Sequence, residues 1–335
     1  MPTPAEKTVA SRTKLISKST FNNYDACLNP YVGCEFGCSY CYVRFFIKDP
    51  NKEWGEFVRV RMHMEDKLPK ELQKGYLRFD DGTETYTDPE TGEIKKRKKK
   101  KDFLINETRL VIGTMTDPYQ PAEKKYKITR KALEILTDPK KPQFAKVGIF
   151  TRSPLVLNDL DLIKKLPNAR VHFTITPYPP EVLRVIEPYA SKTSRRWQVV
   201  QKLKEAGIRT HVNISPVMPI ISEGFTEEFV NRLVDLDIDE YFVDPMQPYS
   251  DSFEAFKESC KSLEGVEWHQ IEQTMLDKEK YLDWKMDFFT EWNEIRRKIQ
   301  HKVPEQLPIW SDHENKVWID ISDSMIDNFI RVFLL

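Results

Sequence analysis

Strand-like and helix-like segments alternate between residues 107 and 245 of this 335-residue chain. The strand-like pieces are short and rich in β-branched residues, whereas the helix-like pieces carry apolar residues at helical spacing. Strands that alternate with helices predict a parallel sheet covered by helices. The number of units favours a barrel, so we predict an α/β fold built on a partial (β/α)6-type barrel. The predicted strands are 109–114, 146–150, 170–176, 208–215 and 240–244, and the predicted helices are 128–136, 158–166, 194–206 and 226–234.

Two of the predicted strands have one apolar and one polar face, because side chains alternate along a strand. The strand 170–176 places Val171, Phe173 and Ile175 opposite His172, Thr174 and Thr176. The strand 208–215 places Val212 and Ile214 opposite His211, Asn213 and Ser215. Strands in a helix-covered sheet are normally apolar on both faces. We therefore expect the polar faces to line a lumen that holds a polar ligand; the alternative is that these residues lie at an edge or pair with one another.

Residues 76–102 interrupt the alternation. The stretches Asp-Asp-Gly and Asp-Pro-Glu-Thr-Gly are turn signals between strand-like pieces, so we predict a β-hairpin insertion. The segment ends in the basic run Lys95–Lys101, whereas the whole chain has 52 basic and 52 acidic residues and no net charge. The run is the concentrated basic site of the sequence, and it predicts either contact with a nucleic-acid backbone or a solvated loop.

The two ends of the chain differ from its middle. Residues 1–20 are polar and lack the apolar stretch of a signal peptide, so we predict a loose N-terminal arm. We assign residues 21–250 to the barrel and residues 251–335 to a helical C-terminal extension that caps the barrel mouth. Within that extension we expect one or two helices in 266–300, and a Pro-marked turn and a strand, KVWIDI, after residue 300. No run reaches the roughly 20 apolar residues that span a membrane.

Three of the five cysteines form one compact motif. The segment NPYVGCEFGCSYCY spaces Cys34, Cys38 and Cys41 as C-x3-C-x2-C. Three thiolates in a glycine-containing loop can bind three irons of a [4Fe–4S] cluster and leave the fourth iron to a small-molecule ligand. A structural zinc site with Cys27 as the fourth ligand is the alternative, although paired zinc cysteines are usually two residues apart.

The cysteine count also bears on the compartment. The total is odd, and Cys260 lies far from the other four. Such a set is a poor disulfide framework for a chain of this length. A reducing compartment fits it better, and we expect a cytoplasmic protein.

The motif C-x3-C-x-aromatic-C, with Tyr40 as the aromatic residue, resembles the signature of the radical S-adenosylmethionine (SAM) superfamily. Asn29-Pro30-Tyr31 before the first cysteine and Tyr42 after the last resemble the spore photoproduct lyase-like branch, also described as DNA repair photolyase-related. Further segments resemble that branch in order and spacing: 113–123, 150–163, 173–176, 187–196 and 204–219.

The resemblance implies two cofactors, a [4Fe–4S] cluster on Cys34, Cys38 and Cys41, and SAM on the remaining iron. It also implies that Tyr40 lies against the adenine of SAM. The methionyl carboxylate of SAM would be met by three polar side chains, which by motif fall on Thr116, Arg152 and Thr174, with Thr176 as a further candidate. Arg152 stands where the lyases have a lysine, and it keeps the positive charge that a buried carboxylate needs.

The activity that the resemblance implies is radical chemistry by a lyase or a transferase. A low-potential electron donor of the flavodoxin or ferredoxin type would reduce the cluster, and a 5′-deoxyadenosyl radical from SAM would abstract hydrogen from a substrate, for which a nucleic acid or nucleotide is the leading prediction. The true lyases carry a hydrogen-donating cysteine at the position of Thr114. A hydroxyl bond is too strong for that role, so Thr114 argues against repair of spore photoproduct itself, and whether the radical is returned to SAM stays open.

Two other functions fit the same residues. One is radical modification of a protein or a small molecule, in which case the basic hairpin is dispensable for activity. The other is a non-catalytic iron–sulfur or zinc-binding interaction protein, in which case the reduced protein does not cleave SAM.

Overall fold

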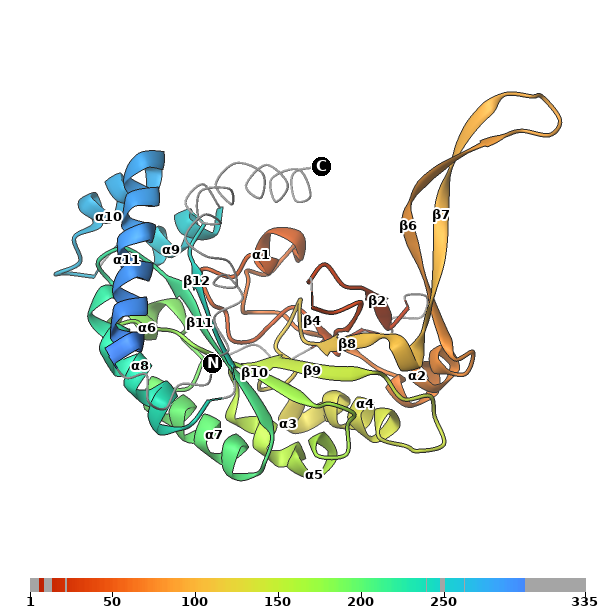
Figure 1. The fold of residues 1–335 in the computed structure, drawn as a ribbon, viewed down its shortest axis with the longest axis horizontal. Helices are drawn as coiled ribbons and strands as arrows, with labels where there is room; N and C mark the ends of the chain where they lie inside the picture. The colour runs from red at the N-terminus through yellow and green to blue at the C-terminus, as the bar shows by residue number, and fades with distance from the viewer. Residues whose placement is uncertain are drawn as a thin grey trace.

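A seven-stranded sheet forms the centre of the computed structural model (Figure 1), which describes residues 6–8, 14–21, 23–238, 240–247, 251–261 and 263–298. The strand order is β12-β11-β10-β9-β8-β3-β2. β3 and β8 to β12 all run parallel, and β2 pairs antiparallel with β3. The predicted α/β fold with a partial barrel of six parallel strands is therefore confirmed. The strands are β2 (Ile16–Lys18), β3 (Ala26–Leu28), β8 (Arg109–Ile112), β9 (Lys146–Thr151), β10 (Arg170–Ile175), β11 (Arg209–Val217) and β12 (Glu240–Pro245).

Helices follow the parallel strands and cover the outer face of the sheet (Figure 1). The bounds of α4 are those predicted, and α7 and α8 agree with prediction to within one residue. The predicted helix 158–166 differs, because Ser153 accepts the N–H of Leu155 and begins a 3-10 helix (Pro154–Asp159) that leaves only one α-helical turn. The helices are α3 (Glu123–Tyr126), α4 (Ile128–Leu136), α5 (Leu160–Ile163), α6 (Pro180–Ile186), α7 (Thr193–Glu205) and α8 (Thr226–Asp235).

The outer face of the strands is apolar, as the sequence predicts. Val171, Phe173 and Ile175 of β10 are fully buried against the helices, together with Val212 and Ile214 of β11. The helices supply the matching apolar side chains. This burial fixes which strand face points outward, and so it directs the polar residues of the same strands into the lumen.

The lumen is filled near the amino-terminal ends of the strands. The Tyr24 hydroxyl and His172 Nε2 share a hydrogen bond of 2.6 Å, and the His172 ring stacks on Phe150 at 4.2 Å. The His211 ring lies 4.6 Å from that of His172. Burial, and then the neighbouring His211, lower the pKa of His172 well below its usual value. The two histidines are therefore internal polar contacts that fill the lumen at this end.

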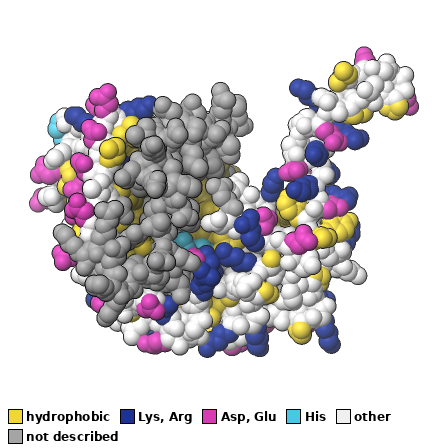
Figure 2. Space-filling view, viewed as in Figure 1, with side chains coloured by type: hydrophobic (Ala, Val, Ile, Leu, Met, Phe, Trp, Pro, Cys, Tyr) yellow, Lys and Arg dark blue, Asp and Glu magenta, His cyan; other side chains and the backbone are white. Residues whose placement is uncertain are grey.

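The predicted hairpin is present as β6 (Tyr76–Thr87) and β7 (Ile94–Leu104), which project away from the barrel (Figure 1). Acidic and basic side chains alternate on it (Figure 2). It contains eight cationic and seven anionic residues, and acids of β6 pair with Arg97 at 2.7 Å and Lys98 at 3.1 Å. The hairpin as a whole is therefore almost neutral, although only some cations of the basic run are in ion pairs.

The N-terminal segment is more ordered than predicted. Ile16 is buried and lies on strand β2 of the main sheet, so the prediction of a loose arm is wrong for this part. A second small sheet has the order β1-β5-β4 and leads into the cysteine loop. The remaining N-terminal elements are β1 (Glu6–Thr8), β4 (Tyr31–Val32), α1 (Val43–Phe46), β5 (Arg59–Arg61), α2 (Met64–Leu72) and a 3-10 helix, Ile105–Glu107.

The predicted helical extension is present as α9 (Asp251–Cys260), α10 (Trp268–Leu276) and α11 (Lys278–Lys298). These helices pack against α6 and α8 beside the last strand, β12 (Figure 1). A short 3-10 helix, Glu223–Phe225, precedes α8. The predicted strand KVWIDI and the turn before it lie outside the described residues. The division of the chain at residues 20 and 250 stays a prediction.

Candidate functional site

The three motif cysteines lie together in one loop between β4 and α1. Cys34 and Cys38 are buried, with 8% and 6% of their surface exposed, and Cys41 is half-buried. All three are free thiols. They share one apolar cluster with four aromatic or small residues, Phe36, Tyr40, Trp54 and Ala190. The sequence motif therefore folds into a compact, water-poor set of thiols.

Two glycines give the loop its path. Gly33 has φ +85°, and a Cβ on it would lie 2.5 Å from the carbonyl oxygen of Phe57. Gly37 has φ +61° and faces the Cα of Gly55, which would be 3.3 Å from an added Cβ. Only glycine takes these backbone angles at little cost, and only glycine allows the chain to approach so closely. The loop is thus shaped before any ligand binds.

Polar contacts fix the same loop from the side of β8. The Thr116 hydroxyl donates to the Gly33 carbonyl at 2.6 Å and accepts from Gln120 Nε2 at 2.8 Å. The side-chain oxygen of Gln120 accepts the N–H of Glu35 at 2.8 Å. Thr116, a predicted SAM contact, therefore lies beside the cysteine loop, where its hydroxyl holds the loop in place.

The electrostatics around the thiols favour their neutral form. Burial raises the pKa of all three cysteines, to about 12 for Cys38. Around Cys38, Arg152 and Arg196 lower the pKa and Glu187 raises it. A thiol in such surroundings stays protonated until a cation binds its sulfur and displaces the proton. Binding of a metal by these thiols would therefore release their protons.

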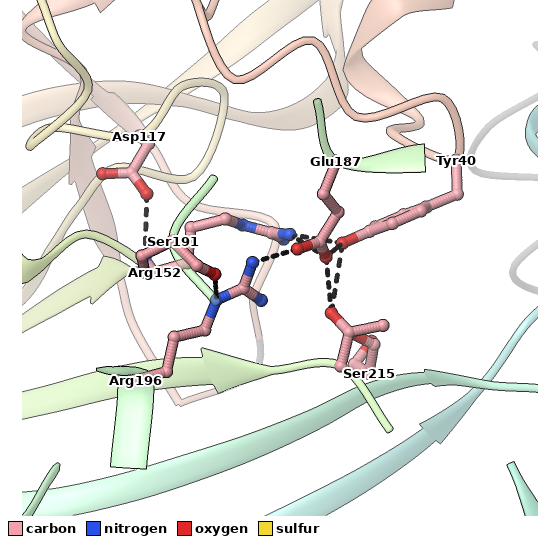
Figure 3. Close-up of polar contacts among 8 residues, drawn as sticks. Tyr40, Asp117, Arg152, Glu187, Ser191, Arg196 and Ser215 are labelled. Atoms are coloured by element: carbon pink, nitrogen blue, oxygen red, sulfur yellow. Dashed lines mark hydrogen bonds and ion pairs between the residues drawn. The ribbon is translucent and has the colours of Figure 1, made fainter. Parts of the chain in front are cut away.

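The loop residue Tyr40 joins a buried polar network at the carboxyl ends of β9 and β10 (Figure 3). Its hydroxyl donates to Glu187, and it also receives a hydrogen bond from Arg152. Arg152 follows β9 directly, and Thr176 follows β10 and donates to Glu187 at 2.5 Å. Three predicted SAM-site residues, Tyr40, Arg152 and Thr176, are therefore adjacent, and they lie where parallel barrels place their active sites.

Arg152 is oriented from two sides. Its backbone N–H donates to Asp117 at 2.9 Å, and its Nη1 donates to Glu187 at 2.6 Å. Its guanidinium lies 5.5 Å from the centre of the Tyr40 ring. Among the described residues, its Nε and Nη2 have no hydrogen-bond partner. That edge of the guanidinium is the planar fork that binds a carboxylate through two parallel hydrogen bonds.

The fourth predicted contact, Thr174, lies on the lumen face of β10. It is half-buried, and it pairs in register with Asn213 of β11. Thr174 is outside the hydrogen-bond network around Glu187. It lies two residues beyond His172 on the same face of β10, toward the carboxyl end of the strand.

Cys27, the alternative zinc ligand, belongs to a different part of the molecule. It lies on β3 in a small cluster with Tyr24 and Val111. Its sulfur is 3.1 Å from the hydroxyl of Ser17 on β2. Thr114 is also placed here, since Asn29 Nδ2 donates to Thr114 at 3.3 Å and lies 4.0 Å from the Cys27 sulfur. Cys27 is thus held apart from the apolar cluster of the three motif cysteines.

The structure also brings in residues to which the sequence assigned no role. They are Asp117, Gln120, Glu187 and Arg196. All four lie in segments that resemble the lyase-like branch, 113–123 and 187–196. The resemblance therefore marked these two segments in the sequence. It could not show which of their side chains contact one another, because the contacts join residues that are far apart in the chain.

The buried polar atoms around the cysteines fit an iron–sulfur cluster. The indole N–H of Trp54, in the same apolar cluster, is buried without an acceptor among the described residues. Such a donor suits an anionic, sulfur-rich group. In the described part of the chain, no three His, Cys, Asp or Glu side chains converge as ligands of one metal ion do. Cysteines that each bind a different iron need no such common point.

The fold and the site together define a class: parallel α/β partial barrels with three free cysteines in one loop at the carboxyl ends of the strands. Within that class, residues 28–233, more than half of the chain, match the model of the radical SAM superfamily. The chain belongs to this superfamily, whose cofactors are a [4Fe–4S] cluster and SAM. Enzymes of the superfamily generally need a reductant. No helix in the described ranges has the length and apolar character needed to cross a membrane.

The chain is similar in sequence to several uncharacterized proteins. An uncharacterized protein of Methanocaldococcus jannaschii is 28% identical over 61% of this chain and 66% of its own length. One of Mycobacterium tuberculosis is 25% identical over 59% of this chain, which spans only 51% of that protein. One of Acidianus two-tailed virus is 25% identical over 75% of this chain and 74% of its own length.

Solved structures support the fold. Spore photoproduct lyase complexed with dinucleoside spore photoproduct matches with a TM-score of 0.54 at 14% identity, over 78% of this chain and 68% of the lyase chain. A point mutant of spore photoproduct lyase, with phenylalanine in place of a tyrosine, matches with a TM-score of 0.55 at 13% identity, over 88% and 78% of the two chains. At these identities, the likeness establishes a shared fold.

Proposed function

We propose that the chain is a radical SAM enzyme in which Cys34, Cys38 and Cys41 hold the [4Fe–4S] cluster. The observation that carries this assignment is the group of three free thiols in one loop shaped by glycines, two of them buried and one half-buried. Held by these cysteines and reduced, the cluster would supply the one electron that cleaves SAM to methionine and a 5′-deoxyadenosyl radical, and this radical would abstract hydrogen from a substrate. We assign the reducing partner to the flavodoxin or ferredoxin type.

The polar residues beside the loop would bind SAM. Arg152 offers its unoccupied Nε–Nη2 edge to the methionyl carboxylate, and Thr174 offers a hydroxyl from the lumen face of β10. Tyr40 lies between Cys38 and Cys41 in the sequence, and its ring packs beside them in the loop. From this position the ring would cover the adenine of SAM. Burial of this region excludes water, which strengthens each charge-assisted hydrogen bond to the carboxylate.

The activity is tested without knowledge of the substrate. Protein reconstituted with iron and sulfide under anaerobic conditions, and reduced with dithionite, is expected to convert SAM to 5′-deoxyadenosine and methionine, measured by chromatography. The matched control is the Cys34→Ala variant treated identically. A fully loaded wild-type protein that forms no 5′-deoxyadenosine would favour the non-catalytic interaction protein.

For the substrate, we propose a nucleic acid or nucleotide, on the evidence of the hairpin. Although the hairpin is almost neutral, its cations are not evenly paired. Four lysines of β7 make no ion pair with a described residue: Lys96, Lys99, Lys100 and Lys101. Because side chains alternate along a strand, Lys99 and Lys101 lie on one face of the hairpin and Lys96 and Lys100 on the other, so each face offers two unpaired ammonium groups to phosphates.

Changing these four lysines to glutamine is expected to flatten the salt dependence of nucleic-acid binding. Each phosphate contact contributes a slope of about −0.7 to −0.9 in log K against log salt, so four contacts contribute roughly −3. Binding is measured by fluorescence anisotropy over a salt series. The control changes four exposed lysines on helices, Lys70, Lys124, Lys202 and Lys280, and keeps the same net charge. An absence of binding at low salt by the wild type would instead favour a protein or small-molecule substrate.

A further inference from the structure

Glu187 lies at the centre of the buried network beside the cysteine loop (Figure 3). Only 3% of its surface is exposed. Its carboxylate accepts hydrogen bonds from Tyr40, Arg152, Thr176 and Arg196. These four donors come from the cysteine loop, the ends of β9 and β10, and helix α7. A single carboxylate therefore joins four separate elements at the carboxyl ends of the strands.

Two arginines pair with the carboxylate of Glu187, and a second carboxyl group, that of Asp117, lies beside Arg152. The two arginines are Arg152 and Arg196, and Arg196 Nη1 is buried without a partner among the described residues. Although burial alone would raise the pKa of Glu187, Arg196 and then Arg152 hold it at about 2. Glu187 is therefore ionised at neutral pH and is a full countercharge for the two arginines.

The contact between Glu187 and Arg152 uses only one nitrogen of the guanidinium. Nη1 is the atom that meets both Glu187 and Tyr40. Because the guanidinium is planar and rigid, holding Nη1 on one side fixes the direction in which the Nε–Nη2 edge points. Glu187 thus determines where a second carboxylate would meet Arg152.

Contacts with α7 and with the cysteine loop fix the position of Glu187 itself. Arg196 donates to Glu187 and, through Nε, to the Ser191 carbonyl at 2.8 Å. The residue before Glu187, Ile186, accepts the N–H of Ser39 in the cysteine loop at 2.9 Å. The position of Glu187 is therefore tied both to α7 and to the loop that carries Cys38.

We propose that Glu187 is a positioning residue for SAM, which acts by holding Arg152 with its free edge toward the methionyl carboxylate. This inference rests on the proposed function, since it assumes that Arg152 meets SAM. A buried ion pair adds little net stability, because desolvation of the charges offsets their attraction. Specific orientation is the benefit that such a network provides.

The direction in which SAM affinity changes in Glu187→Gln distinguishes a positioning role of Glu187 from a purely electrostatic one. In Glu187→Gln, the local positive charge rises, so charge alone would tighten the binding of an anionic carboxylate. The amide also turns an NH2 group toward groups that are themselves donors, and Arg152 loses its fixed orientation. We expect SAM affinity to fall at least tenfold while the iron content stays that of the wild type.

The measurement is a titration of the reduced cluster with SAM, followed by the change in its electron paramagnetic resonance spectrum. The matched control is Glu240→Gln. Glu240 also pairs with two arginines, Arg170 and Arg209, but at the amino-terminal end of β12. We expect this variant to lower the melting temperature and to leave SAM affinity within twofold of wild type. Unchanged or tighter SAM binding by Glu187→Gln would overturn the proposal.

A double-mutant cycle distinguishes this inference from the proposed function. If Glu187 acts through Arg152, then Glu187→Gln in the Arg152→Ala background weakens SAM at least threefold less than it does in the wild type. Equal effects in both backgrounds would contradict positioning through Arg152. If Arg152→Ala alone leaves SAM affinity unchanged, the proposed SAM site is wrong, which is a separate failure.

A second variant covers the case in which Glu187→Gln does not load the cluster. Glu187→Asp keeps the countercharge but withdraws the carboxylate from Arg152 by one methylene group. We expect it to keep the cluster and to weaken SAM at least threefold. Loss of the cluster in both variants would assign Glu187 to folding of the loop and would overturn the positioning role.

Discussion

Alanine at Cys34, Cys38 or Cys41 is expected to abolish iron loading. Anaerobic reconstitution of the wild type should give about four irons per chain, because three cysteines suffice to hold a cube whose fourth iron takes a small molecule. With one thiolate removed, the remaining two leave two irons without protein ligands, and the cluster is lost. Iron and sulfide assays, with the visible absorbance of the cluster, measure the result.

Two other cysteines provide matched controls for this experiment. Cys27 is hydrogen-bonded to Ser17 outside the cluster of the three motif cysteines. Cys260 is fully buried among apolar residues of α9 and α10. Both Cys27→Ala and Cys260→Ala should load about four irons per chain. A loss of the cluster in the Cys27 variant would make Cys27 a ligand and would revive the zinc-type ligand set.

The parallel barrel could be predicted because its strands and helices have different periodicities. The residues of β10 alternate so that Val171, Phe173 and Ile175 share one face, and that face is the buried one. Gly207 follows the helix α7 with φ +73°, as expected of a helix C-terminus. Such local patterns suffice where burial of one face decides the structure.

Short strands in the N-terminal segment were not predicted for the opposite reason. β3 has only three residues, Ala26–Leu28, and all three are buried. β2 has three residues as well, in a segment that is mostly polar. Three residues show no period. β3 is a strand because it pairs with β8, which is more than 80 residues away in the sequence, and β2 in turn pairs with β3. Long-range pairing of this kind leaves no local trace.

The site was predictable in its residue types and not in its contacts. The cysteine motif and Arg152 are recognisable from the sequence. Glu187, which joins Tyr40 to Arg152, is not, because its partners lie 147 and 35 residues away. The filling of the lower lumen by Tyr24 was also unforeseen, since Tyr24 precedes β3 and meets His172 only in the folded chain.

Arg152→Ala is expected to weaken SAM binding by about 2–5 kcal/mol, because a buried carboxylate then loses its charged partner. At 1.4 kcal/mol for each factor of ten, this corresponds to at least about a 30-fold rise in Kd. The cluster should still load, since Arg152 is not a ligand. Arg152→Lys keeps the charge but not the planar fork, so its affinity should fall between those of the wild type and Arg152→Ala.

Arg170→Ala is the matched control for Arg152→Ala. The Arg170 side chain is 15% exposed and pairs with Glu240, while that of Arg152 is 16% exposed and pairs with Glu187. Both substitutions therefore leave a carboxylate with one arginine fewer and cost similar stability. Only Arg152 lies at the carboxyl ends of the strands beside the cysteines, so only its loss should change the titration of the reduced cluster with SAM. Equal SAM affinities for the two variants would place the methionyl carboxylate elsewhere in the lumen, with Thr174 as the next residue to change.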